Sequence, residues 1–415
     1  MGRRVLLLLG PGLVTGAADD DPSGIATYSS VGAQFGYSML WTMLFIYPFM
    51  AGIQEISARL GRITGHGIAG NIQKYYPRWI AYSIVLLLLI ANIINIGADI
   101  GAMGGAVNLL VGGPALVYCV VISVISVLLQ VFIAYKTYSA GLKLLSLSLF
   151  AYVGTVFVTH VPWTEALLGT FTPTISFDSK FMAALIAVLG TTISPYLFFW
   201  QAGEEVELKD STPKAKALKR TPKRAEPELQ RIKADTYIGM AFSNLIAYFI
   251  ILTVAVTLHA NGKNDIESAA QAAEALRPIA GPFASLLFSL GIVGTGLLAL
   301  PVLAGSAAYA VGETFRWPVG LERKPKEAKA FYAVLAAATL IGLVLNFTKT
   351  DPIKALVWSA IINGVTAAPV MVFMMLMASR REIVGQLKPP LYLTAIGWTA
   401  AAIMAVAAIG MFATN

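Results

Sequence analysis

The stretch that decides the fold is LLLLGPGLVTGAADDDPSGIATYSSVGA, residues 6–33, an apolar run interrupted by three successive aspartates. Both flanks are apolar enough for a membrane helix, whereas carboxylates at membrane depth must face protein, water or a cation. Pro22 lacks a backbone donor and Gly24 permits unusual dihedral angles, so we expect the helix to unwind at residues 19–24. Unwinding frees carbonyl oxygens beside the carboxylates, and hard cations bind such a set of oxygens.

A second apolar stretch, residues 181–202, is interrupted in a similar way at Ser194-Pro195. The simplest alternative for the first interruption is a charged loop between two short helices. The recurrence weakens that alternative, because one loop would not repeat at a matched place in a second span. We therefore expect two broken membrane helices.

Composition places the chain among polytopic membrane proteins. Of its 415 residues 57% are hydrophobic and 13% are charged, about half the charged fraction of soluble domains. The single cysteine, Cys119, excludes an internal disulfide and a thiolate metal cluster. No catalytic triad, zinc motif or ATP-binding motif is present, so we expect neither an enzyme nor a primary pump, and no cofactor.

A membrane helix needs about 20 apolar residues, and the sequence offers eleven candidate spans. They lie near residues 6–33 (broken), 38–58, 79–108, 114–134, 140–160, 181–202 (broken), 235–258, 281–310, 328–347, 354–378 and 391–412.

Charge in the loops predicts the orientation. Loops rich in Lys and Arg alternate with poorer ones along the whole chain. By the positive-inside rule the N-terminus is cytoplasmic and the C-terminus, after an odd number of spans, is extracellular. The net charge of +8 thus reflects topology, and we expect a plasma-membrane protein in contact with the lipid bilayer, with no nucleic-acid partner and no obligate protein partner.

The positions of the two breaks predict an inverted repeat. Broken spans one and six each begin a set of five, and an odd set places its copy upside down in the membrane. We expect a first repeat over residues 1–160, a second over 181–378 and an additional span at 391–412. Residues 204–233 are predicted to be a flexible cytoplasmic loop, either a solvated linker or a polybasic lipid-binding segment.

The side chains at both breaks are oxygen ligands. Asp21 is the best candidate because it immediately precedes the first break. An all-oxygen set favours Mg²⁺, Ca²⁺ or Mn²⁺ over softer metals. The other candidates are Asp20, Ser23, Thr191, Thr192, Ser194 and Tyr196, and the roles of Asp19 and Asp20 are not separable from the sequence.

Several further polar residues fall within the predicted spans. For amides such as Asn92, Asn95 and Asn363 the simplest interpretation is a hydrogen bond between helices. For Asp99 the sequence supports a functional role and a structural pairing equally well.

The chain resembles the Nramp family of divalent-metal transporters. Gly-Pro-Gly at residues 10–12 followed by Asp-Pro-Ser-Gly at 21–24 is similar to the first span of that family. Residues 54–65 resemble the end of its second span, residues 92–102 its third and residues 305–313 the end of its eighth. The resemblance covers most of the chain and implies a leucine-transporter-type fold, in agreement with the predicted repeat.

Departures from the family pattern concern the metal and the proton. The Met-Pro-His of the sixth span is matched by Ser-Pro-Tyr at residues 194–196, and the Asn of the first span by Gly24. Serine and glycine at those positions would leave room for water. The second acid of the third span is matched by Ala102 while Asp99 retains the first, and residues 328–347 lack the family's arginines.

This pattern resembles the Nramp-related magnesium transporter branch, in which a larger site takes partly hydrated Mg²⁺ without proton coupling. The resemblance implies a ligand role for Asp21 and backbone-carbonyl roles for Ala18 and Thr191. Asn363 falls near the family's tenth-span ligand position.

The leading hypothesis is a secondary-type transporter that imports Mg²⁺, and Mn²⁺ with it, by alternating access. The alternative is a proton-coupled Mn²⁺/Fe²⁺ importer of the ordinary Nramp type. A sodium-coupled amino-acid transporter of the same fold is disfavoured, because three aspartates would repel the substrate carboxylate. A membrane sensor is disfavoured because no large soluble domain is present.

Overall fold

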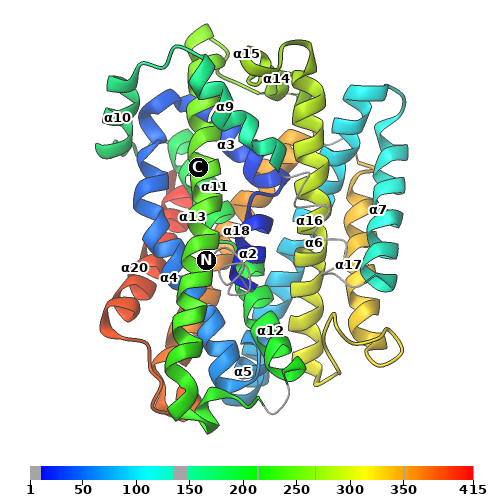
Figure 1. Cartoon of the computed structure of the whole chain (residues 1–415), viewed down its shortest axis with the longest axis vertical. Coiled ribbons are helices and arrows are strands. Elements are labelled where there is room, and N and C mark those ends of the chain that lie inside the picture. Colours follow the sequence, from blue (N-terminus) through cyan, green and yellow to red (C-terminus); the bar gives the residue numbers. More distant parts are fainter. Residues whose placement is uncertain (1–10, 134–146, 213–214, 267, 349–350, 415) are drawn as a thin grey trace.

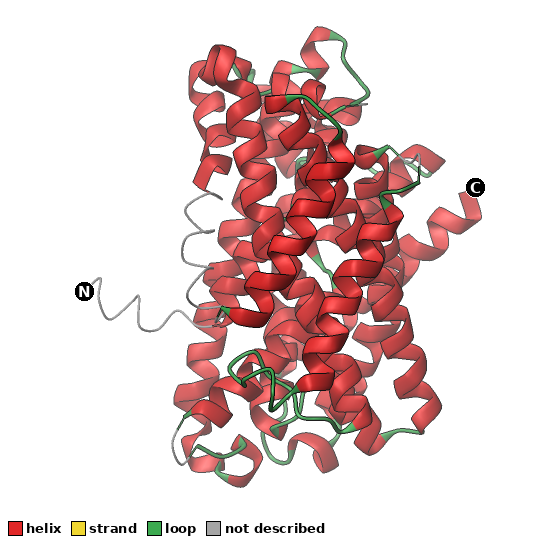
Figure 2. Ribbon diagram, turned by 90° about the vertical axis from the view of Figure 1, so that its right-hand side faces the viewer, coloured by secondary structure: helices red, strands yellow, loops and turns green. Residues whose placement is uncertain are grey.

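The computed structural model describes residues 11–133, 147–212, 215–266, 268–348 and 351–414. Within these residues every regular element is a helix, and most helices run along the long axis of the bundle (Figure 2). The all-α prediction is confirmed for this part of the chain.

Each predicted span has a helical counterpart. The first span is divided into α2 and α3 and the sixth into α11 and α12. In chain order the elements are α2 (Pro11–Asp19), α3 (Pro22–Phe35), α4 (Trp41–Thr64), α6 (Arg78–Val111), α7 (Ala115–Phe132), α9 (Phe150–Val158), α11 (Ser179–Thr192), α12 (Pro195–Ser211), α13 (Ala225–Thr257), α16 (Ala284–Phe315), α17 (Lys329–Leu345), α18 (Pro352–Ser379) and α20 (Leu391–Thr414).

Short helices occupy several connections between these spans. Most of them gather at the two ends of the bundle, with α14 and α15 at the upper end of Figure 1 and α5 at the lower end. Their bounds are α5 (Ile68–Tyr75), α10 (Trp163–Phe171), α14 (Ala269–Glu274), α15 (Arg277–Ala280) and α19 (Arg381–Val384).

Length and composition alone identify fewer spans than the sequence pattern does. Among the described residues, seven helices can cross a membrane by themselves. An eighth is added if Pro22–Met39 and Trp41–Thr64, which meet at an angle of 108°, count as one bent pair. The fifth and ninth predicted spans correspond to shorter apolar helices, Leu147–Val158 and Lys329–Leu345. The first of these follows residues 134–146, which lie outside the description.

The prediction of a loop over residues 204–233 is wrong, because most of these residues are helical. Helix α12 continues to Ser211 and α13 begins at Ala225, so that only residues 212–224 connect them. Leu218 in this connection is buried, and the Lys219 ammonium donates to the Glu382 backbone carbonyl. Polar helices can extend beyond the membrane, and charge alone therefore did not distinguish a helical extension from a loop.

The two broken helices lie together at the centre of the bundle. α12 packs against α2 and α11 packs against α3, while α13 covers α2 and α3 and α6 packs against α16, α17 and α18 (Figure 1). Close approach depends on small residues. A Cβ on Gly190 of α11 would lie 2.0 Å from the Ala360 carbonyl oxygen of α18, so the two backbones touch as they do at small-residue membrane interfaces.

Candidate metal site

The first break separates α2 from α3 at Asp20 and Asp21, which lie outside both helices. Asp21 has an extended backbone and is the N-cap of α3, where its Oδ1 accepts the Gly24 N–H at 2.7 Å. Pro22 occupies the first helical position, where a missing N–H costs nothing. The predicted break is confirmed, but it is shorter than residues 19–24, because the helix restarts at Pro22 and Gly24 lies within it.

The second break separates α11 from α12 at Ile193 and Ser194, and Pro195 again begins the new helix. The Ser194 hydroxyl donates to the Gly190 carbonyl at 2.6 Å and to the Thr191 carbonyl at 3.1 Å. Ser194 therefore satisfies carbonyl groups that the end of α11 leaves without helical partners.

Asp21 joins the two breaks. Its Oδ2 accepts from Asn95 Nδ2 at 3.0 Å and lies 3.4 Å from the Tyr196 hydroxyl, and the residue is 1% exposed. The same Tyr196 hydroxyl lies 3.5 Å from the Ala18 carbonyl. Both Tyr196 contacts are long for hydroxyl hydrogen bonds, so Tyr196 closes the site loosely whereas Asn95 holds Asp21 directly.

A polar chain continues from Asp21 across α6 to α18. Asn95 Nδ2 also donates to Asp99 Oδ2 at 3.2 Å, and Asn95 Oδ1 accepts from Asn363 Nδ2 at 3.1 Å. All four residues are buried. Through these hydrogen bonds the predicted ligand Asn363 is linked to Asp21 with one side chain, that of Asn95, between them.

Asp19 and Asp20 face a different helix. The Ser243 hydroxyl of α13 lies 2.5 Å from Asp19 Oδ2 and 3.1 Å from Asp20 Oδ1. The structure therefore does not bring the Asp20 carboxylate to the partners of Asp21.

Ser23 and Gly24 contact opposite neighbours of α3. The Ser23 hydroxyl donates to the Leu356 carbonyl at 3.3 Å and accepts from Ser359 of α18 at 3.3 Å. A Cβ on Gly24 would lie 3.2 Å from the Thr191 hydroxyl. Gly24 and Thr191 are thus side by side, and any larger residue at position 24 would crowd the break.

Three residues hydrogen-bond to the residues at the first break and were not predicted to do so from the sequence, namely Asn95, Ser243 and Ser359. Asn95 lies four residues before Asp99, a spacing that places both on one face of a helix, so its link to Asp99 was within reach. Ser243 and Ser359 carry no sequence signal, because their partners are more than 200 residues away.

The hydrogen-bond partners of the Asp21 carboxylate are nitrogen and oxygen atoms. In the part of the chain that the structure describes, no group of three or more His, Cys, Asp and Glu residues is arranged to hold a metal. A cation at Asp21 would therefore draw its remaining ligands from hydroxyls, carbonyls and water, which suits a hard cation.

A cavity of about 570 Å³ is lined in part by Asn264 and Asp265, in the connection that leads to α14 at one end of the bundle. It is lined by α3, α11 and α18 and reaches Thr27 and Ala187. Thr27 lies one turn beyond Gly24, and Ala187 one turn before Thr191. This cavity therefore ends about one helical turn from the break.

Toward the other end the bundle is closed by polar contacts. The Gly12 N–H at the start of α2 donates to Asp235 Oδ2 of α13 at 2.7 Å. Gln54 Nε2 donates to Gln201 Oε1 at 2.7 Å, and Gln201 Nε2 donates to the Thr236 hydroxyl at 2.8 Å. These bonds tie α2 and α12 to α4 and α13.

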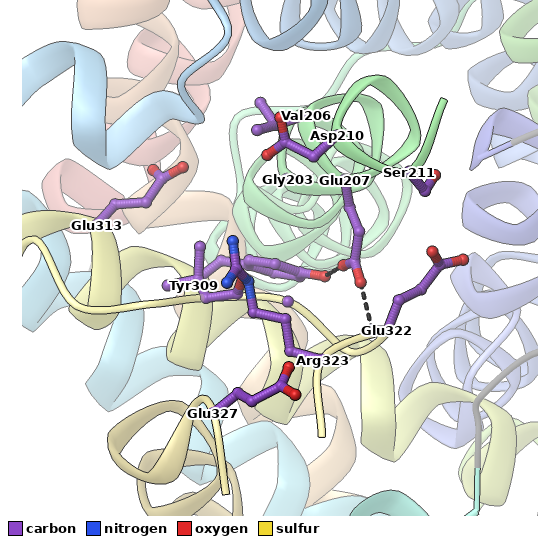
Figure 3. A pocket seen from close by; sticks show the side chains of 12 residues that line it. Gly203, Val206, Glu207, Asp210, Ser211, Tyr309, Glu313, Glu322, Arg323 and Glu327 are labelled. Atoms are coloured by element: carbon purple, nitrogen blue, oxygen red, sulfur yellow. Dashed lines mark hydrogen bonds between the residues drawn. The ribbon is translucent and has the colours of Figure 1, made fainter. Parts of the chain in front are cut away.

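An acidic cavity of about 220 Å³ lies beside the end of α12 (Figure 3). Two of its carboxylates, Glu207 and Glu313, already have structural partners. Tyr309 donates to Glu207, which also accepts the Leu321 N–H at 3.1 Å, and Glu313 accepts the N–H groups of Gly67 and Gly70 at the start of α5. Glu207 and Glu313 are therefore held in place by the protein itself.

Comparison with known proteins identifies similar sequences along nearly the whole chain. Residues 12–414 match the family described as Natural resistance-associated macrophage protein-like, Nramp. A divalent metal cation transporter MntH of Klebsiella pneumoniae is 25% identical over 409 residues, which cover 96% of this chain and 92% of the relative.

Solved structures show the same fold. The crystal structure of the Eremococcus coleocola manganese transporter matches 98% of this chain and 86% of its own at a TM-score of 0.78 and 14% identity. Mhp1, a nucleobase-cation-symport-1 family transporter in a closed conformation, matches 98% and 90% at a TM-score of 0.58 and 14% identity. The predicted fold class is confirmed by these matches.

Proposed function

The chain belongs to the Nramp family of divalent metal cation transporters, and we propose that it imports Mg²⁺, and Mn²⁺ with it, without coupling to protons. The partly hydrated ion binds beside Asp21, midway through the bundle between the two breaks. It enters through the cavity that ends near Thr27 and leaves when α2 and α12 separate from α13 and α4.

The observation that carries this proposal is the chemistry at position 194. The residue matched to the family's methionine is Ser194, whose hydroxyl bonds to the end of α11, and the hydrogen-bond partners of Asp21 are nitrogen and oxygen atoms. A site without sulfur loses the preference for softer transition metals, whereas Mg²⁺ binds oxygen and keeps several waters.

The alternative is a proton-coupled Mn²⁺/Fe²⁺ importer, and the comparisons favour it. The similar proteins are named manganese transporter and MntH, and none of these names refers to magnesium. Asp99, which matches one of the two acids of the family's third span, is retained here. The two hypotheses share Mn²⁺ as a substrate and differ over Mg²⁺ and the proton.

Lack of coupling is proposed from the surroundings of Ala102, which matches the second acid. Ala102 lines a cavity of about 330 Å³ together with Phe288 and Ile292. Among the described residues that line this cavity the one carboxylate is Asp351, which accepts the N–H groups of Ile353 and Lys354 as the N-cap of α18. An inside-negative potential alone favours divalent entry by about 4.6 kcal/mol per 100 mV, twice the single-charge value.

We assign the ion-binding residues in three groups. Asp21 supplies the carboxylate, Ala18 and Thr191 supply backbone carbonyls, and Ser194 with Gly24 leaves room for water. Ser23, Tyr196 and Asn363 surround the ion through their polar atoms, whereas Asp20 is left out of the ion site because its carboxylate contacts Ser243 of α13.

Orientation follows from loop charge. We place the end with α5 and residues 212–224 in the cytoplasm and the end with α14 and α15 outside, in the plasma membrane, because positive loops remain inside. The repeats are assigned to residues 1–160 and 181–378.

Uptake into sealed vesicles that contain the purified chain tests the proposal. Mg²⁺ and Mn²⁺ are supplied separately while a trapped dye reports the internal pH, and vesicles without protein serve as the control. We expect uptake of both ions without acidification. Uptake of Mn²⁺ with acidification and no uptake of Mg²⁺ would establish the alternative.

A further inference from the structure

One amide group lies between two buried carboxylates. Asn95 Nδ2 donates to Asp21 Oδ2 at 3.0 Å and to Asp99 Oδ2 at 3.2 Å. The exposed fraction is 1% for Asp21 and 0% for both Asn95 and Asp99. The NH₂ group of a neutral side chain is therefore a donor that the two carboxylates share.

This arrangement determines which end of the Asn95 amide and of the Asn363 amide donates a hydrogen bond and which end accepts one. Only the NH₂ end of Asn95 can donate to two carboxylates, so its Oδ1 must accept, and Asn363 must turn its own NH₂ group toward it. The Asn363 carbonyl oxygen is left over. Asn363 Oδ1 and Asp99 Oδ1 are buried and have no hydrogen-bond partner in the described structure.

This network leaves two buried acceptors, Asp99 Oδ1 and Asn363 Oδ1, unsatisfied. Each such group costs about 1–3 kcal/mol, and a charged group costs more. Here the shortage is of donors alone, because the cluster contains two carboxylates and two amide oxygens. A cation that carries bound water would meet two needs of the cluster. The ion neutralises the carboxylates, and its water molecules donate hydrogen bonds to the two free oxygens.

We propose that the transported cation occupies the place of the Asn95 amide, between Asp21 and Asp99, during part of its passage. Asp21 binds the ion directly, while Asp99 Oδ1 and Asn363 Oδ1 accept hydrogen bonds from its water molecules. Asn95 holds the two carboxylates in position when the ion is absent and moves aside when it binds. This inference rests on the proposed function, because it requires Asp21 to bind the cation.

The assignment makes Asp99 a determinant of ion preference. Mg²⁺ gives up its water reluctantly, so it depends more than Mn²⁺ on groups that accept hydrogen bonds from that water. Changes to groups behind the direct ligands lower metal affinity by about 10- to 100-fold. Replacement of Asp99 should therefore weaken Mg²⁺ binding more than Mn²⁺ binding.

Titration calorimetry of the purified full-length chain with MgCl₂ and with MnCl₂ tests this inference. The variants are Asp99→Asn, which keeps the shape of the side chain, and Asp21→Asn. Asp178→Asn is the matched control, because Asp178 is an exposed N-cap outside the site and asparagine caps equally well. Thermal midpoints without metal report folding for each variant.

For Asp99→Asn we expect at least tenfold weaker Mg²⁺ binding, a smaller loss for Mn²⁺ and an unchanged midpoint. Unchanged Mg²⁺ affinity would overturn the inference, and so would an equal loss for both ions, which indicates a structural role. In either case loss of binding in Asp21→Asn would leave the proposed function standing. Binding of both ions by Asp21→Asn as tightly as by the parent would contradict the proposed function itself.

Discussion

Replacement of Gly16 by alanine should move α2 away from α13. An added Cβ at Gly16 would lie 2.2 Å from the Gly239 carbonyl oxygen and 2.4 Å from the Gly239 carbonyl carbon. Ordinary van der Waals contact begins at 3.4 Å, so the two helices must separate by about 1 Å. Because backbone atoms cannot rotate aside as a side chain can, the strain falls on the packing of the two helices.

The size of the effect follows from the cost of overpacking, which is about 1–3 kcal/mol. If this cost raises the free energy of only the conformation in which α2 is closed on α13, the population shifts toward the open conformation by about 5- to 150-fold. Gly105→Ala is the matched control, because an added Cβ on Gly105 of α6 meets nothing within 4 Å.

Thiol labelling reads out the opening of α2. Thr15 of α2 is 0% exposed, and the native Cys119 is buried, so a Thr15→Cys variant has a low background. We expect a membrane-impermeant maleimide to label this cysteine faster when Gly16→Ala is added and at the original rate when Gly105→Ala is added. Equal labelling and equal metal uptake in both double variants would refute the packing argument.

Three further predictions concern single contacts. Ser194→Met should shift preference from Mg²⁺ toward softer metals in competition binding, and no shift would show that this side chain does not face the ion. Asp235→Ala removes the acceptor of the Gly12 N–H and should destabilise the closed position of α2 by about 1.5–3 kcal/mol, which faster thiol labelling would report. Tyr196→Phe removes two long contacts, at 3.4 Å to Asp21 and at 3.5 Å to the Ala18 carbonyl, so its metal affinity should stay within about threefold of the parent. A larger loss in calorimetry would show that the hydroxyl binds the ion directly.

The breaks were predictable because their causes are local. Asp21 followed by Pro22 caps a helix and begins another, and the sequence displays both properties at once. Ser194-Pro195 repeats the same logic, with an extended residue followed by a helix start. The predicted break was too long at both ends, since α2 includes Asp19 and α3 begins at Pro22. At Gly24 the error arose because glycine permits an unwound backbone without requiring one.

The surroundings of the breaks were harder to predict because they depend on distant parts of the chain. The opposite directions taken by Asp19 and Asp21, toward Ser243 and Asn95 respectively, follow from helix packing. The helical extensions within residues 204–233 were missed for a similar reason. Their charged surfaces look like those of a loop until a contact such as the Arg231–Glu205 ion pair at 2.5 Å is known.

The position of a bound metal tests the central claim most directly. Crystals grown with Mn²⁺ and measured at the manganese absorption edge give an anomalous peak at the ion itself. Our account predicts a peak within bonding distance of an Asp21 carboxylate oxygen, between the two breaks, and its loss in Asp21→Asn. A peak elsewhere, for example in the acidic cavity beside Glu207 (Figure 3), or one that persists in Asp21→Asn, would contradict the account.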